Sequence, residues 1–196
     1  MLENINLRKI PKEQRTYSLC LQAVEVNKMN LKFVPEKYKT EELIQKINRY
    51  NAVIKYIPYE YKTYDMCINA VKRSYYDLKY VPKKFKTLEL CLTSLMKGGI
   101  SIRYIPKKIK TRDFYYLAVK INFWILLHVP DEFITEYICI LGVRQNSSLI
   151  KYIPKKHLTE RLCKLALFDN KKNLENIPED IIIKYDLIDF INKKEQ

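Results

Sequence analysis

The sequence predicts an all-α protein, an α-solenoid of about eight 24-residue helix-turn-helix repeats. Three observations lead to this prediction. Eight prolines recur at intervals of 23 or 24 residues, a threonine follows most of them by five positions, and apolar residues then recur with helical spacing. A fixed period of this length is the signature of a repeat protein, in which each repeat contacts its neighbours.

The prolines set the register of the repeat. The residue before each proline is Ile or Val, and the residue four before it is Leu or Ile, so the apolar positions recur together with the proline. The prolines are Pro11, Pro35, Pro58, Pro82, Pro106, Pro130, Pro154 and Pro178.

The threonine five residues after each proline is expected to begin a helix, because its hydroxyl can accept a main-chain N–H of the first turn. Acidic residues follow it, where the helix dipole favours negative charge. Asn or Gly arrives about three turns later, as at Asn51, Gly98 and Asn146, where a left-handed C-terminal cap is expected. The threonines are Thr16, Thr40, Thr63, Thr87, Thr111, Thr135 and Thr159, and Ile183 takes their place in the last repeat.

The segment around each proline is expected to be a short helix or turn, broken or begun at the proline, that packs antiparallel on the capped helix. The main alternative is a leucine-rich repeat, which can have the same length and a similar L-x-x-I-P pattern. It would need an L-x-L strand followed by an asparagine ladder, which this sequence lacks. Residues 1–196 are therefore predicted to form a single repeat domain with atypical caps at 1–6 and 185–196.

The repeat also resembles a known family. The pattern L-x-[YF]-[IV]-P-x-x-[FY]-[KR]-T-x-x-[LM]-C-x-x-A-V is seen in LKFVPEKYKT from Leu31 and in IKYIPYEYKTYDMCINAV from Ile54. It resembles a proline-and-threonine repeat family of unknown function that is abundant in mimivirus-like giant viruses. The resemblance extends over nearly the whole chain and implies a helical-repeat fold and a viral origin. It implies no activity and no catalytic residues.

The five cysteines share one position of the repeat, nine residues after the proline. Equivalent residues of successive repeats should lie about 8–10 Å apart, which exceeds the ~7 Å between α-carbons that a disulfide can bridge. A single Cys per repeat with no His nearby is also unsuitable for zinc. We therefore expect reduced core residues in a reducing, intracellular compartment. The cysteines are Cys20, Cys67, Cys91, Cys139 and Cys163.

The sequence offers no catalytic motif. His128 and His157 stand where other repeats have aromatic residues, and no Ser-His-Asp or Cys-His arrangement can be assembled around them. Only three glycines are present, which argues against a phosphate-binding glycine loop. We expect no enzyme activity, no cofactor, no metal and no small-molecule substrate. No apolar run reaches the ~18 residues of a membrane-spanning helix, and the first residues do not resemble a signal peptide.

Positive charge is concentrated in one part of the chain. The formal net charge is +14, and residues 72–112 alone carry +10. Because stacking aligns equivalent positions, the cations near the prolines should form a basic edge that attracts an acidic protein surface, a nucleic acid or a ribonucleoprotein. The alternative is that these lysines only solvate one face. The predicted edge consists of Lys79, Lys83, Lys84, Lys86, Arg103, Lys107, Lys108, Lys110, Lys151, Lys155 and Lys156.

A second candidate surface interrupts this edge in the apolar stretch INFWILLHVP, from Ile121. The position of Trp124 holds residues of varied polarity in other repeats, which indicates exposure. Phe123, Trp124 and Leu127 are therefore predicted to bind a partner protein or a second copy of the chain, unless this repeat merely packs more tightly. The sequence as a whole predicts a non-catalytic scaffold that binds an acidic macromolecule through its basic edge. The alternatives are a nucleic-acid-binding protein and an adaptor or virion component that uses the Trp124 patch.

Overall fold

The computed structural model describes residues 5–47, 53–96 and 101–193. Every regular element within these ranges is helical, which confirms the all-α prediction. The chain divides into two compact units, Met1–Ile105 and Pro106–Gln196, and the same repeat runs through both. The solenoid of the whole chain stays a prediction.

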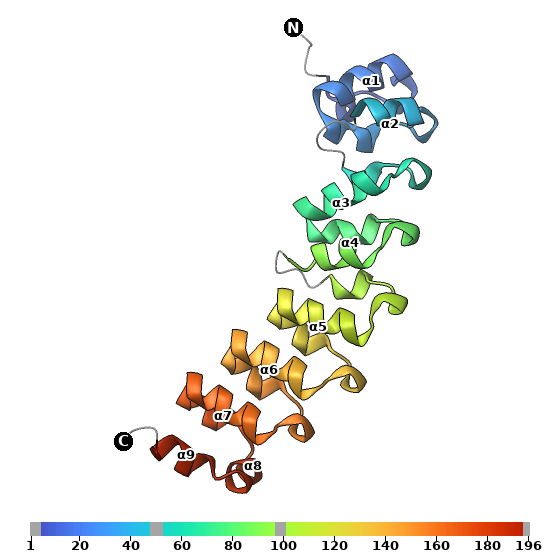
Figure 1. Cartoon of the computed structure of the whole chain (residues 1–196). Helices are drawn as coiled ribbons and strands as arrows, with labels where there is room; N and C mark the ends of the chain where they lie inside the picture. Colours follow the sequence, from blue (N-terminus) through green and yellow to red (C-terminus); the bar gives the residue numbers. More distant parts are fainter. Residues whose placement is uncertain (1–4, 48–52, 97–100, 194–196) are drawn as a thin grey trace. The chain divides into compact units, whose positions relative to one another are not determined.

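Short α-helices form half of each repeat (Figure 1). The first unit contains α1 (Tyr17–Val26), α2 (Glu41–Ile47), α3 (Tyr64–Arg73) and α4 (Leu88–Thr93), and the second contains α5 (Arg112–Ile121), α6 (Glu136–Gln145), α7 (Glu160–Asp169), α8 (Glu179–Lys184) and α9 (Leu187–Lys193). Within the first unit α1 contacts α2, and α3 contacts α4. Within the second unit α6 lies between α5 and α7 and contacts both.

The other half of the repeat consists of two 3₁₀ helices on either side of the proline. The residue before the proline is extended, as at Val81 (φ −75°, ψ 129°), because proline disfavours the helical region for its predecessor. The proline then begins a three-residue 3₁₀ turn. The segments that precede a proline are η1 (Leu7–Lys9), η3 (Lys28–Phe33), η5 (Ile54–Tyr56), η7 (Tyr75–Tyr80), η9 (Ile102–Tyr104), η11 (Phe123–His128), η13 (Ser147–Tyr152) and η15 (Lys171–Asn176). Those that follow one are η2 (Lys12–Gln14), η4 (Glu36–Tyr38), η6 (Tyr59–Tyr61), η8 (Lys83–Phe85), η10 (Lys107–Ile109), η12 (Asp131–Phe133) and η14 (Lys155–His157).

The threonines begin the α-helices as predicted. The Oγ1 of Thr111 accepts the main-chain N–H of Phe114 at 3.2 Å, and Thr87 caps α4 through Leu90 in the same way. Each such bond satisfies one N–H that has no partner inside the helix. The threonine therefore determines where each of the helices α1 to α7 starts.

The prediction of left-handed caps at the asparagines is wrong. Asn122, Asn146 and Asn170 end their α-helices with extended backbones, with φ between −153° and −146°. Each side chain caps the next element instead: the Oδ1 of Asn146, for example, accepts the N–H of Ser148 at 3.1 Å. Asparagine lies directly before the 3₁₀ segment and accepts the N–H two residues further along, a role that sequence spacing alone does not separate from a left-handed cap. Asn51 and Gly98 lie outside the described residues.

The core is built from the apolar positions that recur with the prolines. Leu31, Leu78 and Ile150, each four residues before a proline, are almost completely buried, and so are all five cysteines, which are free thiols. Burying one such aliphatic side chain contributes about 1.5–3 kcal/mol. The helices also approach closely: a Cβ added to Gly142 would lie 2.9 Å from the Cδ2 of Leu126. Small residues recur at this position for that reason, as at Ala118 and Ala166.

The last repeat departs from the pattern where Ile183 replaces threonine. Without the hydroxyl cap, the turn after Pro178 extends into α8, and the chain reverses at Asp186 with a positive φ of 48° before α9. The predicted C-terminal cap thus contains α9 as far as Lys193, and residues 194–196 are not described. Of the predicted N-terminal cap, residues 1–4 are not described, and Asn6 caps η1 through its side chain.

The geometry at Asn170 makes a prediction that distinguishes the two kinds of cap. At a left-handed position glycine would stabilise the protein, whereas at an extended acceptor position it removes the bond to the N–H of Lys172 and adds chain entropy to the unfolded state. We expect Asn170→Gly to lower the free energy of unfolding by about 0.3 kcal/mol, and Asn170→Asp, which keeps an acceptor, to leave it nearly unchanged. Urea unfolding measures both, and a gain in stability for Asn170→Gly would contradict the assignment.

Candidate polyanion-binding surface

The cysteines are buried, and they do not cluster with histidine or carboxylate side chains in the part of the chain that the structure describes. No group of three His, Cys, Asp or Glu side chains there could hold a metal ion. Burial raises the pKa of Cys67 and of Cys91 to about 11, and that of Cys139 to about 12. Since the thiolate is the reactive form, these thiols are packing residues at neutral pH, as predicted from their common position.

The predicted basic edge separates into three kinds of cation, according to distance from the proline. The first kind lies four residues after the proline and points into the protein. The Nζ of Lys86 donates to the main-chain oxygen of Tyr104 at 2.8 Å, and Lys62 donates to Tyr80 in the same manner. Each bond therefore joins one repeat to the 3₁₀ segment of the next.

Burial lowers the pKa of Lys62, Lys86 and Lys110. Lys62 is buried, and Lys86 and Lys110 are only half exposed. A cation held in this way by a carbonyl is a structural group, because removing it leaves a partly buried oxygen without its donor. Two residues of the predicted edge, Lys86 and Lys110, thus lie at a position that supports the stacking of repeats.

The second kind lies three residues before the proline and covers an aromatic ring. The Nζ of Lys79 is 4.8 Å from the ring centre of Tyr80, the guanidinium of Arg103 is 4.7 Å from that of Tyr104, and Lys151 lies 4.7 Å from its neighbour Tyr152. Such contacts at exposed sites contribute about 0.5–1 kcal/mol. These cations remain exposed to solvent while the rings limit their motion.

The third kind directly follows the proline and is exposed, and in it Lys84 also covers a ring, with its Nζ 4.9 Å from the ring centre of Phe85. Lys83 and Lys84 in η8, and Lys107 and Lys108 in η10, are exposed. Within the described ranges, none of the four has a carboxylate within ion-pair distance of its Nζ. Lys83 and Lys84 belong to the first unit, and Lys107 and Lys108 to the second.

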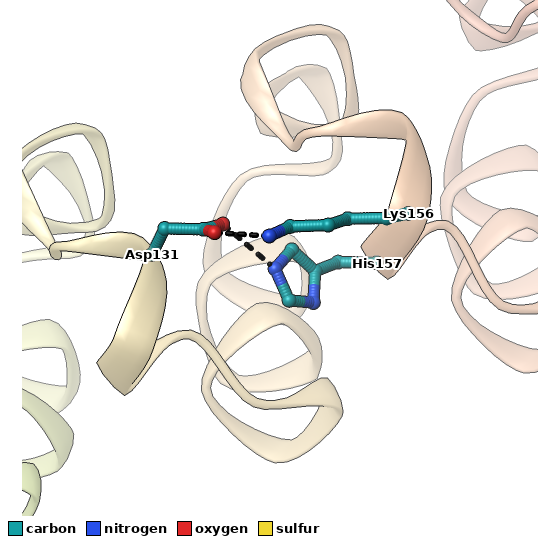
Figure 2. Close-up of polar contacts among 3 residues, drawn as sticks. All are labelled: Asp131, Lys156 and His157. Atoms are coloured by element: carbon teal, nitrogen blue, oxygen red, sulfur yellow. Dashed lines mark hydrogen bonds and ion pairs between the residues drawn. The ribbon is translucent and has the colours of Figure 1, made fainter.

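Lys155 and Lys156 occupy the same positions in a later repeat, but carboxylates neutralise them. Lys155 pairs with Asp180 at 2.6 Å. Lys156 pairs with one oxygen of Asp131, and the Nε2 of His157 lies 3.0 Å from the other (Figure 2). The bonds to Lys156 and His157 hold the pKa of Asp131 below its usual value. These two lysines therefore join neighbouring repeats within the second unit.

The predicted apolar patch is exposed in the second unit. Trp124 retains 43% and Leu127 41% of its accessible surface, and Phe123 is half-buried with its ring centre 5.2 Å from that of Trp124. Ile125 and Leu126, which lie between Trp124 and Leu127 in η11, are buried, so this segment packs through one side and exposes the other.

A further basic group, outside the predicted edge, lies in the first two repeats. Arg8, Lys12 and Lys37 line a depression of about 430 Å³ together with Arg15 and Lys32. The signal was present, because all five occupy positions of the repeat that are cationic elsewhere. They are not part of the predicted edge because the net charge around them is lower than in residues 72–112.

The comparisons with known proteins give a partial match. Residues 87–134 are similar to a family described as a domain of unknown function, DUF4116. The match covers about a quarter of the chain and spans two repeat periods, from the capping Thr87 to the residue before the capping Thr135. No curated protein and no solved structure matches the chain. In the described part of the chain, no helix is long and apolar enough to cross a membrane.

The contacts of Asp131 predict a pH-dependent contribution to stability. Its pKa is lower in the folded state than the unfolded value of about 3.9, so its contribution is present above about pH 4 and is lost as pH falls through the folded pKa. We expect Asp131→Asn to lower the urea midpoint at pH 7 and to match the wild type more closely at pH 3. Glu175→Gln, at an exposed carboxylate without an ion pair in the described residues, is the control. An equal deficit for Asp131→Asn at both pH values would contradict this prediction.

Proposed function

We propose that the chain is a non-catalytic helical-repeat scaffold that binds a polyanionic macromolecule through the exposed lysines that follow its prolines. The observation that carries this proposal is the exposure of Lys83, Lys84, Lys107 and Lys108 without neutralising carboxylates in the described residues. Lys79 and Arg103, held over aromatic rings, add further cations in the first unit.

The contrast among equivalent positions supports the proposal. If these lysines only kept one face of the protein hydrated, there would be no reason for some of them to have carboxylate partners and others none. Lys155 and Lys156 are engaged by Asp180 and Asp131, whereas Lys83 and Lys84 face no such partner among the described residues. Unpaired cations of this kind attract phosphates, and their affinity falls steeply with salt as counterions are released.

Nucleic acid is the form of polyanion that we favour. Aromatic rings flank the cations, as at Tyr80 and Tyr104, and basic residues beside aromatic rings are common in proteins that bind single strands. An acidic protein surface is the other outcome of the same test. In the wider proposal, the chain is related to the proline-and-threonine repeats of giant viruses and acts in a reducing compartment, which its five free cysteines support.

A second candidate function rests on the Trp124 patch. Two large apolar side chains that are each about two-fifths exposed, beside a half-buried aromatic ring, suit a protein–protein contact. In this reading the chain is an adaptor or self-associating component, and its binding should depend little on salt.

Fluorescence anisotropy with single-stranded RNA, duplex DNA and an acidic peptide, across a salt series, tests the main proposal. We expect tight binding of nucleic acid at low salt. Changing Lys83, Lys84, Lys107 and Lys108 to Ala should weaken it at least about tenfold and reduce the logarithmic salt slope by about 3. The matched control changes Lys46, Lys120, Lys172 and Lys193 to Ala, which removes the same charge at other exposed positions.

The control variant shows whether the nucleic acid is attracted by these four lysines or by the net positive charge of the whole chain. Equal losses in the two variants would mean that the net charge, rather than these lysines, attracts the probe. Selective binding of the acidic peptide would replace nucleic acid by protein as the partner. Absence of binding to every probe at low salt would overturn the proposal and direct attention to Trp124, whose removal would then be tested by sedimentation velocity.

A further inference from the structure

The first two repeats form a depression whose lining is mainly cationic. It has a volume of about 430 Å³ and lies entirely within the first unit. Small-molecule sites commonly measure about 300–1,000 Å³. The cations that line it are Arg8, Lys12, Arg15, Lys32 and Lys37.

The positive charge of this depression is not compensated by its own lining. Among the described residues that line it, Glu36 is the single carboxylate. The Oε1 of Glu36 is paired with the Nζ of Lys39, which is buried and is not part of the lining. The carboxylate is therefore occupied elsewhere, and the cations of the depression remain available to an anion.

Three of the cations are held in place before any ligand arrives: Arg15, Lys32, and Lys37, whose Nζ lies 4.8 Å from the ring centre of Tyr38. The Nε of Arg15 donates to the main-chain oxygen of Ile10 at 2.9 Å, and its Nη1 donates to that of Phe33 at 2.6 Å. This uses two of the five N–H groups of the guanidinium and leaves the others. The Nζ of Lys32 lies 4.7 Å from the ring centre of Phe33. A site whose cations are already ordered loses less conformational entropy when it binds.

In the second unit, carboxylates of the chain itself bind lysines at the equivalent positions of the repeat. Lys12 and Lys37 lie one and two residues after their prolines. Asp131 and Asp180 hold those positions in the second unit, and there they bind Lys156 and Lys155. Around Pro130, Pro154 and Pro178, carboxylates of the chain thus neutralise the lysines of the neighbouring repeat. Between the first two repeats, Lys12 and Lys37 hold the corresponding positions, and both are cations.

We propose that this depression is a binding site for a small ligand that carries two or more phosphate groups. Several converging cations match a multiply charged anion better than a single phosphate, and an ordered guanidinium suits phosphate oxygens. A second depression, of about 440 Å³, shares Arg8, Lys32 and Phe33 with the first and is also lined by Asn27 and Met29. It gives room for the part of the ligand that carries no phosphate. The site is separate from the lysines of the proposed macromolecular surface.

Isothermal titration calorimetry with inorganic triphosphate, on the full chain at about 100 mM salt, tests this proposal. We expect one site per chain. The variant Arg8→Ala/Lys12→Ala/Lys37→Ala, which leaves the structural Arg15 intact, should bind triphosphate at least tenfold more weakly. The matched control is Lys83→Ala/Lys84→Ala/Lys108→Ala, which loses the same charge and should keep the wild-type affinity. Circular dichroism checks that both variants are folded.

A single-stranded oligonucleotide, titrated into the same three proteins, separates this proposal from the function proposed above. The small-ligand site and the proposed function are both supported if only the Arg8/Lys12/Lys37 variant loses triphosphate binding and the Lys83/Lys84/Lys108 variant binds the oligonucleotide more weakly. Failure of oligonucleotide binding alone would remove the proposed function and leave this site in place. Three results would overturn the small-ligand site. The wild type does not bind triphosphate, the two variants lose triphosphate binding equally, or oligonucleotide binding is lost mainly in the first variant.

Discussion

The bond from a cation in one repeat to a main-chain oxygen in the next is the interaction on which the stacking of the first unit depends. Proline removes a main-chain donor and interrupts the helix, so carbonyl oxygens beside it lack helical partners. A side chain from the preceding repeat supplies the missing donor: Arg15 reaches Phe33, Lys62 reaches Tyr80, and Lys86 reaches Tyr104. The same proline that ends one helix therefore creates the acceptor that joins two repeats, and the 24-residue period keeps donor and acceptor in register.

This constraint also determines which charges are available for function. The whole chain is rich in basic residues, but three of the cations four residues after proline, Arg15, Lys62 and Lys86, are bound to main-chain carbonyls. Most of those three residues before proline lie over rings. Those directly after proline either meet a carboxylate of a neighbouring repeat or have no ion pair in the described structure. Lys83 and Lys156 differ in this last respect although they are both exposed lysines that follow a proline. The candidate surfaces therefore follow from the repeat itself.

Much of the fold could be predicted from the sequence because the repeat presents each position seven or eight times. Threonine caps, buried aliphatic positions and buried cysteines were all predictable, since each has one dominant physical role at its spacing. The backbone at Asn146 was not, because asparagine serves both as a left-handed cap and as an acceptor for a following turn. The division of the cations was not predictable either. Lys86 and Lys83 are lysines of the same repeat and cannot be distinguished by residue type. Their roles differ because the Tyr104 carbonyl lies within hydrogen-bond distance of the Nζ of Lys86.

The most direct test of this account compares Lys86→Met with Lys83→Met, which remove one positive charge three residues apart. Urea unfolding should show a loss of about 1–2 kcal/mol for Lys86→Met, because the Tyr104 carbonyl loses its donor, and less than about 0.5 kcal/mol for Lys83→Met. Equal stability of the two variants would contradict the claim that the position relative to proline, rather than charge alone, decides what each cation does.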